Sequence, residues 1–189
     1  MMITGAYALI DIPIVSQLRT LLGLRYEYAD MNVYTFNTAT QKNENLKTTP
    51  LTAHNFLPAI SMTWNATNDM NLRFAFSKTL TRPDFRECTD GKWETYLSDE
   101  VIVGNPELTQ TDIYNADLRY EWFIDAVDLI AVSFFYKYII DPVEMLEITG
   151  SGGTAIYQYM NSPYAHNLGG EIELRKSFDF ITRAMKDLS

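Results

Sequence analysis

Residues 113–123 read Ile-Tyr-Asn-Ala-Asp-Leu-Arg-Tyr-Glu-Trp-Phe, and apolar and polar side chains alternate along the whole stretch. One set of alternate positions is apolar or aromatic: Tyr114, Ala116, Leu118, Tyr120 and Trp122. The other set is polar or charged: Asn115, Asp117, Arg119 and Glu121. A pleated strand directs successive side chains to opposite faces of a sheet. The stretch therefore predicts a strand with one apolar face and one charged face.

The same period of two recurs along the chain. Aromatic residues make up 13% of the sequence, and together with the β-branched residues they favour strands over helices. No helical stripe of comparable length appears. Strands are expected at 6–14, 22–28, 60–65, 72–77, 113–123, 130–138, 154–161 and 168–178. The sequence thus predicts an all-β fold, an antiparallel meander of about eight strands in which neighbours in sequence pair throughout.

The connections between these strands alternate in length. Short turns are expected at 13–18, 68–70 and 123–128, and long polar loops at 37–55, 81–111 and 141–153. Tight turns at one end and long loops at the other are typical of transmembrane β-barrels of outer membranes. From the pattern alone, a soluble β-sandwich or jelly roll is the alternative.

Composition excludes several classes of protein. The formal net charge of −9 argues against a nucleic-acid partner, because phosphate binding needs a basic surface. A single cysteine, Cys88, excludes an internal disulfide framework. No apolar run reaches the roughly 18 residues that a membrane-spanning helix needs, and the N-terminal segment has no signal-peptide pattern.

Three motifs in order along the chain resemble the C-terminal barrel half of TonB-dependent outer-membrane receptors. The first is a strand that ends in Arg82-Pro83; the second is Gly104-Asn105-Pro106, which leads into the next strand after a long loop. The third is the Gly-x-Glu-x-Glu pattern at 169–173. The resemblance covers nearly the whole chain.

The resemblance implies a partial transmembrane β-barrel, residues 1–189 being a fragment of one barrel domain without the plug domain. It implies a non-enzymatic receptor for active uptake of a scarce solute of the siderophore, haem, cobalamin or glycan type. The expected partners are the outer-membrane bilayer, the remaining barrel strands and plug, TonB acting through that plug, and a small-molecule ligand. The double Met start and the ending at Ser189 suggest a truncated frame.

The candidate site residues fall in the long loop at 81–111. We expect Arg86, Trp93 and Tyr96 to contribute to ligand binding at the outer surface, because aromatic side chains supply contact area. Five motif residues are expected to be structural, since proline removes a backbone donor and glycine permits a turn: Arg82, Pro83, Gly104, Asn105 and Pro106. No catalytic, cofactor or metal site is predicted. Cys88 stands beside Glu87 and near Asp90, whose charges disfavour a thiolate.

The charged sets of the strands are expected to line the barrel interior as ion pairs, because charges on the lipid side are costly. If the chain is part of a large barrel, its first and last strands do not pair with each other. A closed eight-stranded barrel without transport activity, structural or adhesive, would pair them. A soluble carbohydrate-binding sandwich would bury Tyr120, Phe134 and Leu174 between two sheets.

Overall fold

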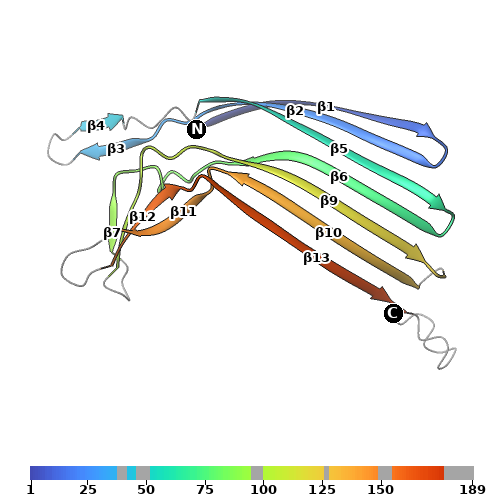
Figure 1. Cartoon of the computed structure of the whole chain (residues 1–189). Helices are drawn as coiled ribbons and strands as arrows, with labels where there is room; N and C mark the ends of the chain where they lie inside the picture. The colour runs from blue at the N-terminus through green and yellow to red at the C-terminus, as the bar shows by residue number, and fades with distance from the viewer. Residues whose placement is uncertain (38–41, 46–51, 95–99, 126–127, 149–154, 177–189) are drawn as a thin grey trace, which may run out of the picture.

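The structure is a computed structural model, and it describes residues 1–37, 42–45, 52–94, 100–125, 128–148 and 155–176. These residues form strands and connections, grouped in three sheets (Figure 1). Within this part of the chain no helix is long and apolar enough to cross a membrane. The predicted all-β class is confirmed.

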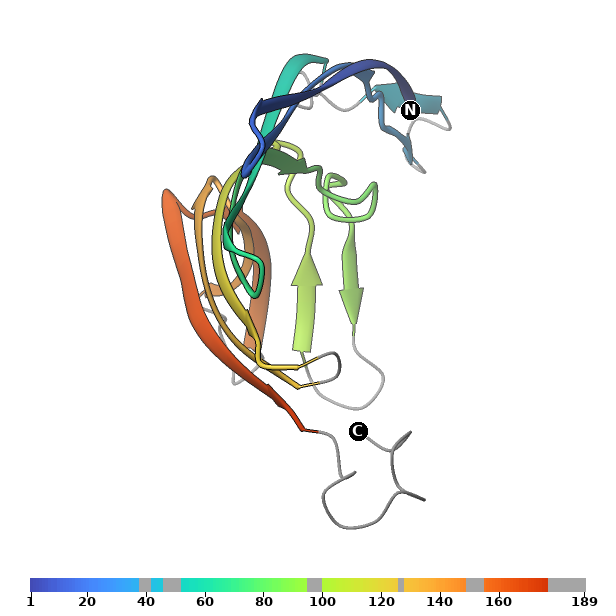
Figure 2. The ribbon, with the colours of Figure 1, turned by 90° about the vertical axis from the view of Figure 1, so that its right-hand side faces the viewer.

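The main sheet has seven antiparallel strands in the order β1-β2-β5-β6-β9-β10-β13. Their bounds are β1 Met2–Val15, β2 Leu18–Asp30, β5 Ala53–Thr67, β6 Met70–Thr81, β9 Thr111–Phe123, β10 Leu129–Ile140 and β13 Tyr164–Arg175. The sheet is curved, and β1 and β13 lie at its opposite edges (Figures 1 and 2). The prediction that the first and last strands do not pair is confirmed, and the closed eight-stranded barrel is excluded.

One predicted strand was assigned to the wrong sheet. The stretch expected at 154–161 is β12 (Ala155–Asn161), and it lies in a separate four-stranded sheet, ordered β11-β12-β8-β7. The other members are β7 Lys92–Glu94, β8 Glu100–Val103 and β11 Val143–Ile148. In the main sheet β10 pairs directly with β13, so neighbours in sequence do not pair throughout. We call this second sheet the loop sheet.

The long connections are therefore more ordered than their polar composition predicted. Two of them supply the loop sheet, in which β12 pairs with β8 in parallel although 51 or more residues separate them. The first connection holds the hairpin of β3 (Tyr34–Asn37) and β4 (Lys42–Asn45). Short apolar runs such as Val101-Ile-Val103 gave a weak local signal, and pairing between distant segments cannot be deduced from period two alone.

The register of the main sheet separates its two faces. Residues that are Cα partners in neighbouring strands share a face, and the apolar sets of β2, β5, β6, β9, β10 and β13 fall on one of them. Strand β1 is apolar on both faces, since Ile3, Tyr7 and Leu9 lie on the other one. On this apolar face Tyr120, Phe134 and Leu174 are 37%, 59% and 73% exposed. No second sheet formed by the described residues covers them, and this excludes the sandwich.

The opposite, charged face is the concave one. Met31 and Val33 continue this face beyond β2 and pack with Cys88 and Leu108 in a small buried cluster, which Val143 and Tyr159 also contact. We call these residues the rim cluster. Cys88 and Leu108 flank β7 and β8, which lie on the concave side of the main sheet in Figure 2. The loop sheet thus stands at the end of the main sheet that carries the long connections.

Candidate functional site: the rim motif, the loop sheet and the charged wall

The motif residues Arg82, Pro83, Gly104, Asn105 and Pro106 form what we call the rim motif. Its first residue, Arg82, follows β6 and contacts β2. The Arg82 guanidinium forms an ion pair with the Glu27 carboxylate at 2.9 Å, and their side chains are only 11% and 9% exposed. Pro83, which follows, is buried. Among the described residues, Arg82 Nε is buried without a hydrogen-bond partner. A shielded ion pair of this kind costs several kcal/mol to break on one side only (about 3–5). The pairing is consistent with the structural role predicted for Arg82, which stays a prediction.

After Pro83 the chain makes one helix-like turn. The carbonyl of Asp84 accepts hydrogen bonds from the backbone N–H groups of Glu87 and Cys88 at 3.1 and 3.2 Å. The Glu87 carboxylate in return accepts from the Asp84 N–H at 2.9 Å, which is one half of a capping box. This turn places Cys88 in the rim cluster, fully buried. Burial first, and then the charges of Glu87 and Asp84, raise the pKa of the Cys88 thiol to about 11, so the thiol is inert.

Gly104 packs against the backbone of that turn. A Cβ at this position would lie 2.2 Å from the Thr89 carbonyl oxygen and 3.0 Å from the carbonyl oxygens of Arg86 and Glu87. The Gly104 N–H donates to the Gly91 carbonyl at 3.1 Å. Glycine is therefore required by close approach of two backbone segments, a stronger reason than the turn predicted from sequence.

Asn105 joins the turn after Pro83 to strand β12 of the loop sheet. Its Nδ2 donates to the Tyr159 carbonyl at 3.0 Å, and its Oδ1 accepts from the Glu107 N–H at 2.9 Å. Its own N–H donates to the Glu87 carbonyl at 2.7 Å, and its carbonyl accepts from the Leu108 N–H at 3.3 Å. Pro106 thus occupies the second position of a β-turn, where proline is favoured. Leu108, the fourth residue of the turn, is fully buried in the rim cluster.

Two of the three residues predicted to bind ligand are neighbours. The Arg86 guanidinium lies over the Trp93 ring, 4.6 Å from its centroid, which is a cation–π contact. Trp93 begins a row across the loop sheet, because it pairs with Ile102 of β8, which in turn pairs with Tyr157 of β12. Tyr96 lies outside the described residues. The role of all three in ligand binding stays a prediction.

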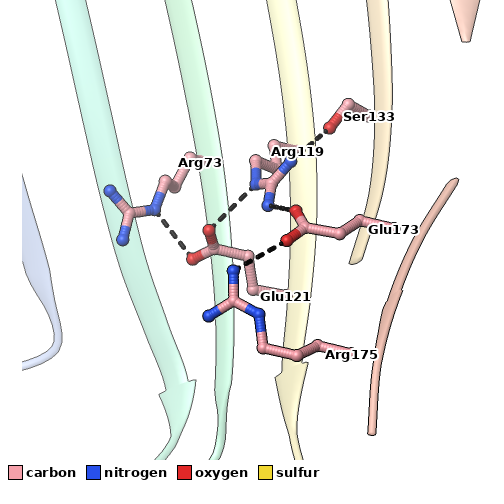
Figure 3. A network of polar contacts seen from close by, with 6 residues as sticks. All are labelled: Arg73, Arg119, Glu121, Ser133, Glu173 and Arg175. Carbon is pink, nitrogen blue, oxygen red and sulfur yellow. Dashed lines mark hydrogen bonds and ion pairs between the residues drawn. The ribbon is translucent and has the colours of Figure 1, made fainter. Parts of the chain in front are cut away.

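On the charged face of the main sheet, which we call the charged wall, a chain of ion pairs and hydrogen bonds crosses β6, β9, β10 and β13 (Figure 3). Glu121 accepts from Arg73 and from Arg119, both at 2.9 Å. Arg119 also donates to Glu173 at 2.6 Å and to the Ser133 hydroxyl at 2.9 Å. Arg73 and Arg119 are directly opposite each other in the register, so the Glu121 carboxylate between them offsets a like-charge contact.

Other polar contacts could not be predicted from the sequence. Arg19 binds Asp11 on the charged face, and Lys78 binds Asp112 at 2.7 Å on the apolar face, near the long connections. Lys176 binds Asp128 at the short-turn end of the sheet. The amides of Asn55 and Gln110 form a reciprocal pair, at 3.2 and 2.7 Å. Asp117 and Glu171 also lie on the charged face, and both are exposed. Within the described residues, no group of three or more His, Cys, Asp or Glu side chains is placed to hold a metal ion.

Comparison with known proteins agrees with this geometry. The family model described as TonB dependent receptor-like, beta-barrel matches residues 3–185. The chain belongs to the TonB-dependent receptor-like β-barrel family. Members of this family are transporters rather than enzymes, and they are outer-membrane proteins of Gram-negative bacteria. A search of curated protein sequences gave no match.

Several solved structures share the fold of this chain. The siderophore receptor PirA from Pseudomonas aeruginosa has a TM-score of 0.68 at 16% identity, over 91% of this chain and 30% of that one. The hemophore receptor HasR of Serratia marcescens, solved with its hemophore HasA and heme, has a TM-score of 0.68 at 13% identity, over 91% and 31%. A ferric enterobactin receptor mutant from Pseudomonas aeruginosa, in complex with enterobactin, has 0.65 at 16%, over 91% and 24%. The chain thus spans between a quarter and a third of the length of these receptors.

Proposed function

We propose that the chain forms part of the barrel wall and the extracellular loops of an outer-membrane receptor for active uptake of a scarce solute. The solute is of the siderophore, haem, cobalamin or glycan type, and TonB supplies the energy through a plug domain. Family membership and the names of the similar structures support this proposal. The observation that carries it is the division of one open sheet into an uncovered apolar face and an ion-paired concave face.

The chain is one part of a single barrel domain in this proposal. The strands β1 and β13 each have one unpaired edge among the described residues, and further strands of the same barrel would pair there. The concave face would then surround the plug, and the apolar face would contact the bilayer. An apolar face toward lipid and a polar interior are the arrangement of membrane barrels.

The ligand would bind on the side of the long connections. There the rim cluster anchors the loop sheet to the end of β2, and Asn105 joins β12 of that sheet to the turn after Pro83. The residues of the loop sheet are thus held on a fixed platform. Arg86 is exposed and stacks on Trp93, and together they offer a cation and an aromatic plane. We propose that Arg86 and Trp93, with Tyr96, contact the solute.

Uptake by whole cells tests the function. The natural full-length polypeptide, expressed in cells that lack their own receptors, is supplied in turn with radiolabelled ferric siderophores, haem, cobalamin and glycans. We expect TonB-dependent uptake of one class, with ligand affinity reduced about fivefold or more by Trp93→Ala, since aromatic contacts in binding sites are often worth about 1 kcal/mol or more. Lys92→Ala, an exposed neighbour, is the matched control and should leave affinity unchanged.

The outcomes separate the alternatives. A polypeptide that fractionates with the outer membrane but supports no uptake of any class would favour a structural or adhesive barrel. Equal affinity of the Trp93→Ala and Lys92→Ala proteins would retain the receptor and overturn the proposed site.

A further inference from the structure

The apolar face of the main sheet also carries a few charged and histidine side chains, and they gather at one end of the face. Among the described strands, the charged and histidine side chains on this face are all in the half nearest the long connections: Asp30, His54, Lys78, Asp112 and His166. The half nearest the short turns carries Trp64 and Trp122 instead. The two ends of the face are thus chemically different.

His54 and His166 each take part in the same arrangement of tyrosine and histidine side chains. His54 is the cross-strand partner of Tyr28, and its Nδ1 is 2.6 Å from the hydroxyl of Tyr26. His166 is the cross-strand partner of Tyr138, and its Nδ1 is 2.8 Å from the hydroxyl of Tyr136. In both places a Tyr-x-Tyr segment of one strand holds a histidine of the next.

The ring geometry of the two places also matches. His54 lies 5.0 Å from the Tyr28 ring and 6.0 Å from the Tyr26 ring, measured between centroids. His166 lies 5.1 Å from the Tyr138 ring and 5.9 Å from the Tyr136 ring. Both imidazoles are exposed. The tyrosines therefore fix the orientation of an outward-facing ring at two separate positions.

This orientation leaves one ring nitrogen of each histidine to donate. When the tyrosine hydroxyl donates to Nδ1, a neutral imidazole carries its proton on Nε2. That N–H can donate a hydrogen bond to an anion beside the sheet. Lys78 contributes less, because its ammonium already binds Asp112 at 2.7 Å.

The two clusters lie at the same height above the short turns. Tyr28 is ten residues after Leu18, the first residue of β2, and Tyr138 is nine residues after Leu129, the first residue of β10. Ten residues of a strand span about 33 Å, or about 25 Å along the barrel axis at the usual tilt, which is the height of the apolar band of such barrels. The histidines therefore stand at the level of lipid headgroups.

We propose that His54 and His166 bind the phosphate groups of lipids in the leaflet on the long-loop side, as headgroup sites that fix the depth of the barrel. This inference rests on the proposed placement of the chain in a membrane. Phosphate oxygens accept charge-assisted hydrogen bonds from the Nε2–H groups, and the flanking tyrosine rings contact the upper part of the acyl chains. The occupant is a membrane lipid, since the clusters lie on the face that would meet the bilayer.

Native mass spectrometry of the natural full-length polypeptide in detergent tests the proposal, with dimyristoylphosphatidylglycerol and dimyristoylglycerol as probes. The two lipids share their chains and differ in the phosphate headgroup. We expect tighter binding of the phosphatidylglycerol, and a loss of about fivefold or more for the His54→Phe/His166→Phe protein, which keeps two rings but removes two donors. Glycerol 3-phosphate, a free headgroup, should not compete at equal concentration.

Two variants make the result specific. Asn167→Ala changes the residue next to His166 on the other face and should bind lipid as the wild type does. His166→Gln, combined with His54→Phe, restores one N–H donor and should recover part of the affinity. Equal retention of both lipids, or no difference between the double Phe protein and the wild type, would overturn the headgroup sites. Heat-modifiable gel migration of each variant reports an intact barrel, so failure of the membrane proposal itself would be seen separately.

Discussion

Single residues of the rim motif have roles that depend on backbone contacts. Gly104 was expected to permit a turn, and the structure shows that it permits contact between its own segment and the turn after Pro83. Outside the rim motif, Gly169 makes room for a side chain instead: it lies under the ring of Phe135, and a Cβ there would be 2.6 Å from that ring. The sequence identifies such glycines as special, but not the segment each one touches, because that segment is distant in the chain.

Replacement of Gly104 by alanine should disrupt the loop region. The added Cβ would meet three backbone carbonyls, which cannot rotate away as a side chain can, so the cost is expected at about 1–3 kcal/mol or more. Cleavage of the outer loops by added protease on intact cells measures the effect and should become faster. Gly23→Ala is the control, because its Cβ would have no neighbour closer than 3.6 Å. Equal cleavage of the two variants would contradict the required close approach.

The buried thiol of Cys88 gives a prediction with a defined pH range. Its pKa of about 11 leaves roughly a hundredfold less thiolate at pH 8 than an ordinary cysteine has. Iodoacetamide should therefore label Cys88 in denaturant and leave it nearly unlabelled in the native protein. Since the unfolded thiol ionises first, the free energy of unfolding of the rim cluster should fall between about pH 9 and 11, and less so in Cys88→Ala. Equally fast labelling of native and denatured protein would refute this.

At the scale of elements, period two predicted the strands of the main sheet but only one strand of the loop sheet, β12, whose sheet it did not predict. Six of the seven meander strands, all except β1, show two distinct faces in sequence, so the alternation predicts which side chains share a face, but not the register. The strands β7 and β8 are only three and four residues long, too short to show a period. Strand β12 was predicted from a weaker alternation and does form a strand, but it lies in the loop sheet, since β10 pairs with β9 and β13 on its two sides.

Adjacent residues of β9 offer a direct test of the two faces. Leu118 is exposed on the apolar face and Asp117 on the charged face. In the natural full-length polypeptide, Leu118→Arg should weaken folding into lipid vesicles by about 2–4 kcal/mol, the usual cost of a cation near the bilayer midplane. Asp117→Asn should change it by less than about 0.5 kcal/mol. Denaturant titration of the vesicle-folded proteins measures both, and similar costs for the two variants would argue against a lipid-facing side.

For the whole molecule, the sequence predicted the fold class, the open edges and the family, because each follows from patterns repeated along the chain. The ion-pair partners could not be predicted, since Glu121 and Glu173 reach across strands according to a register that the sequence alone does not give. The same holds for the rim cluster, which joins residues from three connections or strand ends. The alternation along a strand determines which face of the sheet each side chain occupies. The register between strands determines which side chains are in contact.

The open sheet leads to the last prediction, which concerns residues 1–189 expressed alone. The large apolar side chains of the outer face are exposed, Leu168, Ile172 and Leu174 of β13 by more than 70% each. Soluble monomers rarely expose a contiguous apolar patch beyond a few hundred Å² (about 300–600). Among the described residues, β1 and β13 also each present one edge of unpaired backbone groups, which favours association between chains.

We therefore expect the isolated chain to form inclusion bodies, or to dissolve only in detergent with the circular dichroism of β-structure. Size-exclusion chromatography in plain buffer, followed by thermal unfolding of any soluble fraction, is the measurement. The natural full-length polypeptide is the control, because closure of the barrel would pair both edges, and it should give a single species in detergent. A monodisperse 189-residue monomer that unfolds cooperatively in plain buffer would mean that the apolar face is covered in a way that an open sheet does not allow.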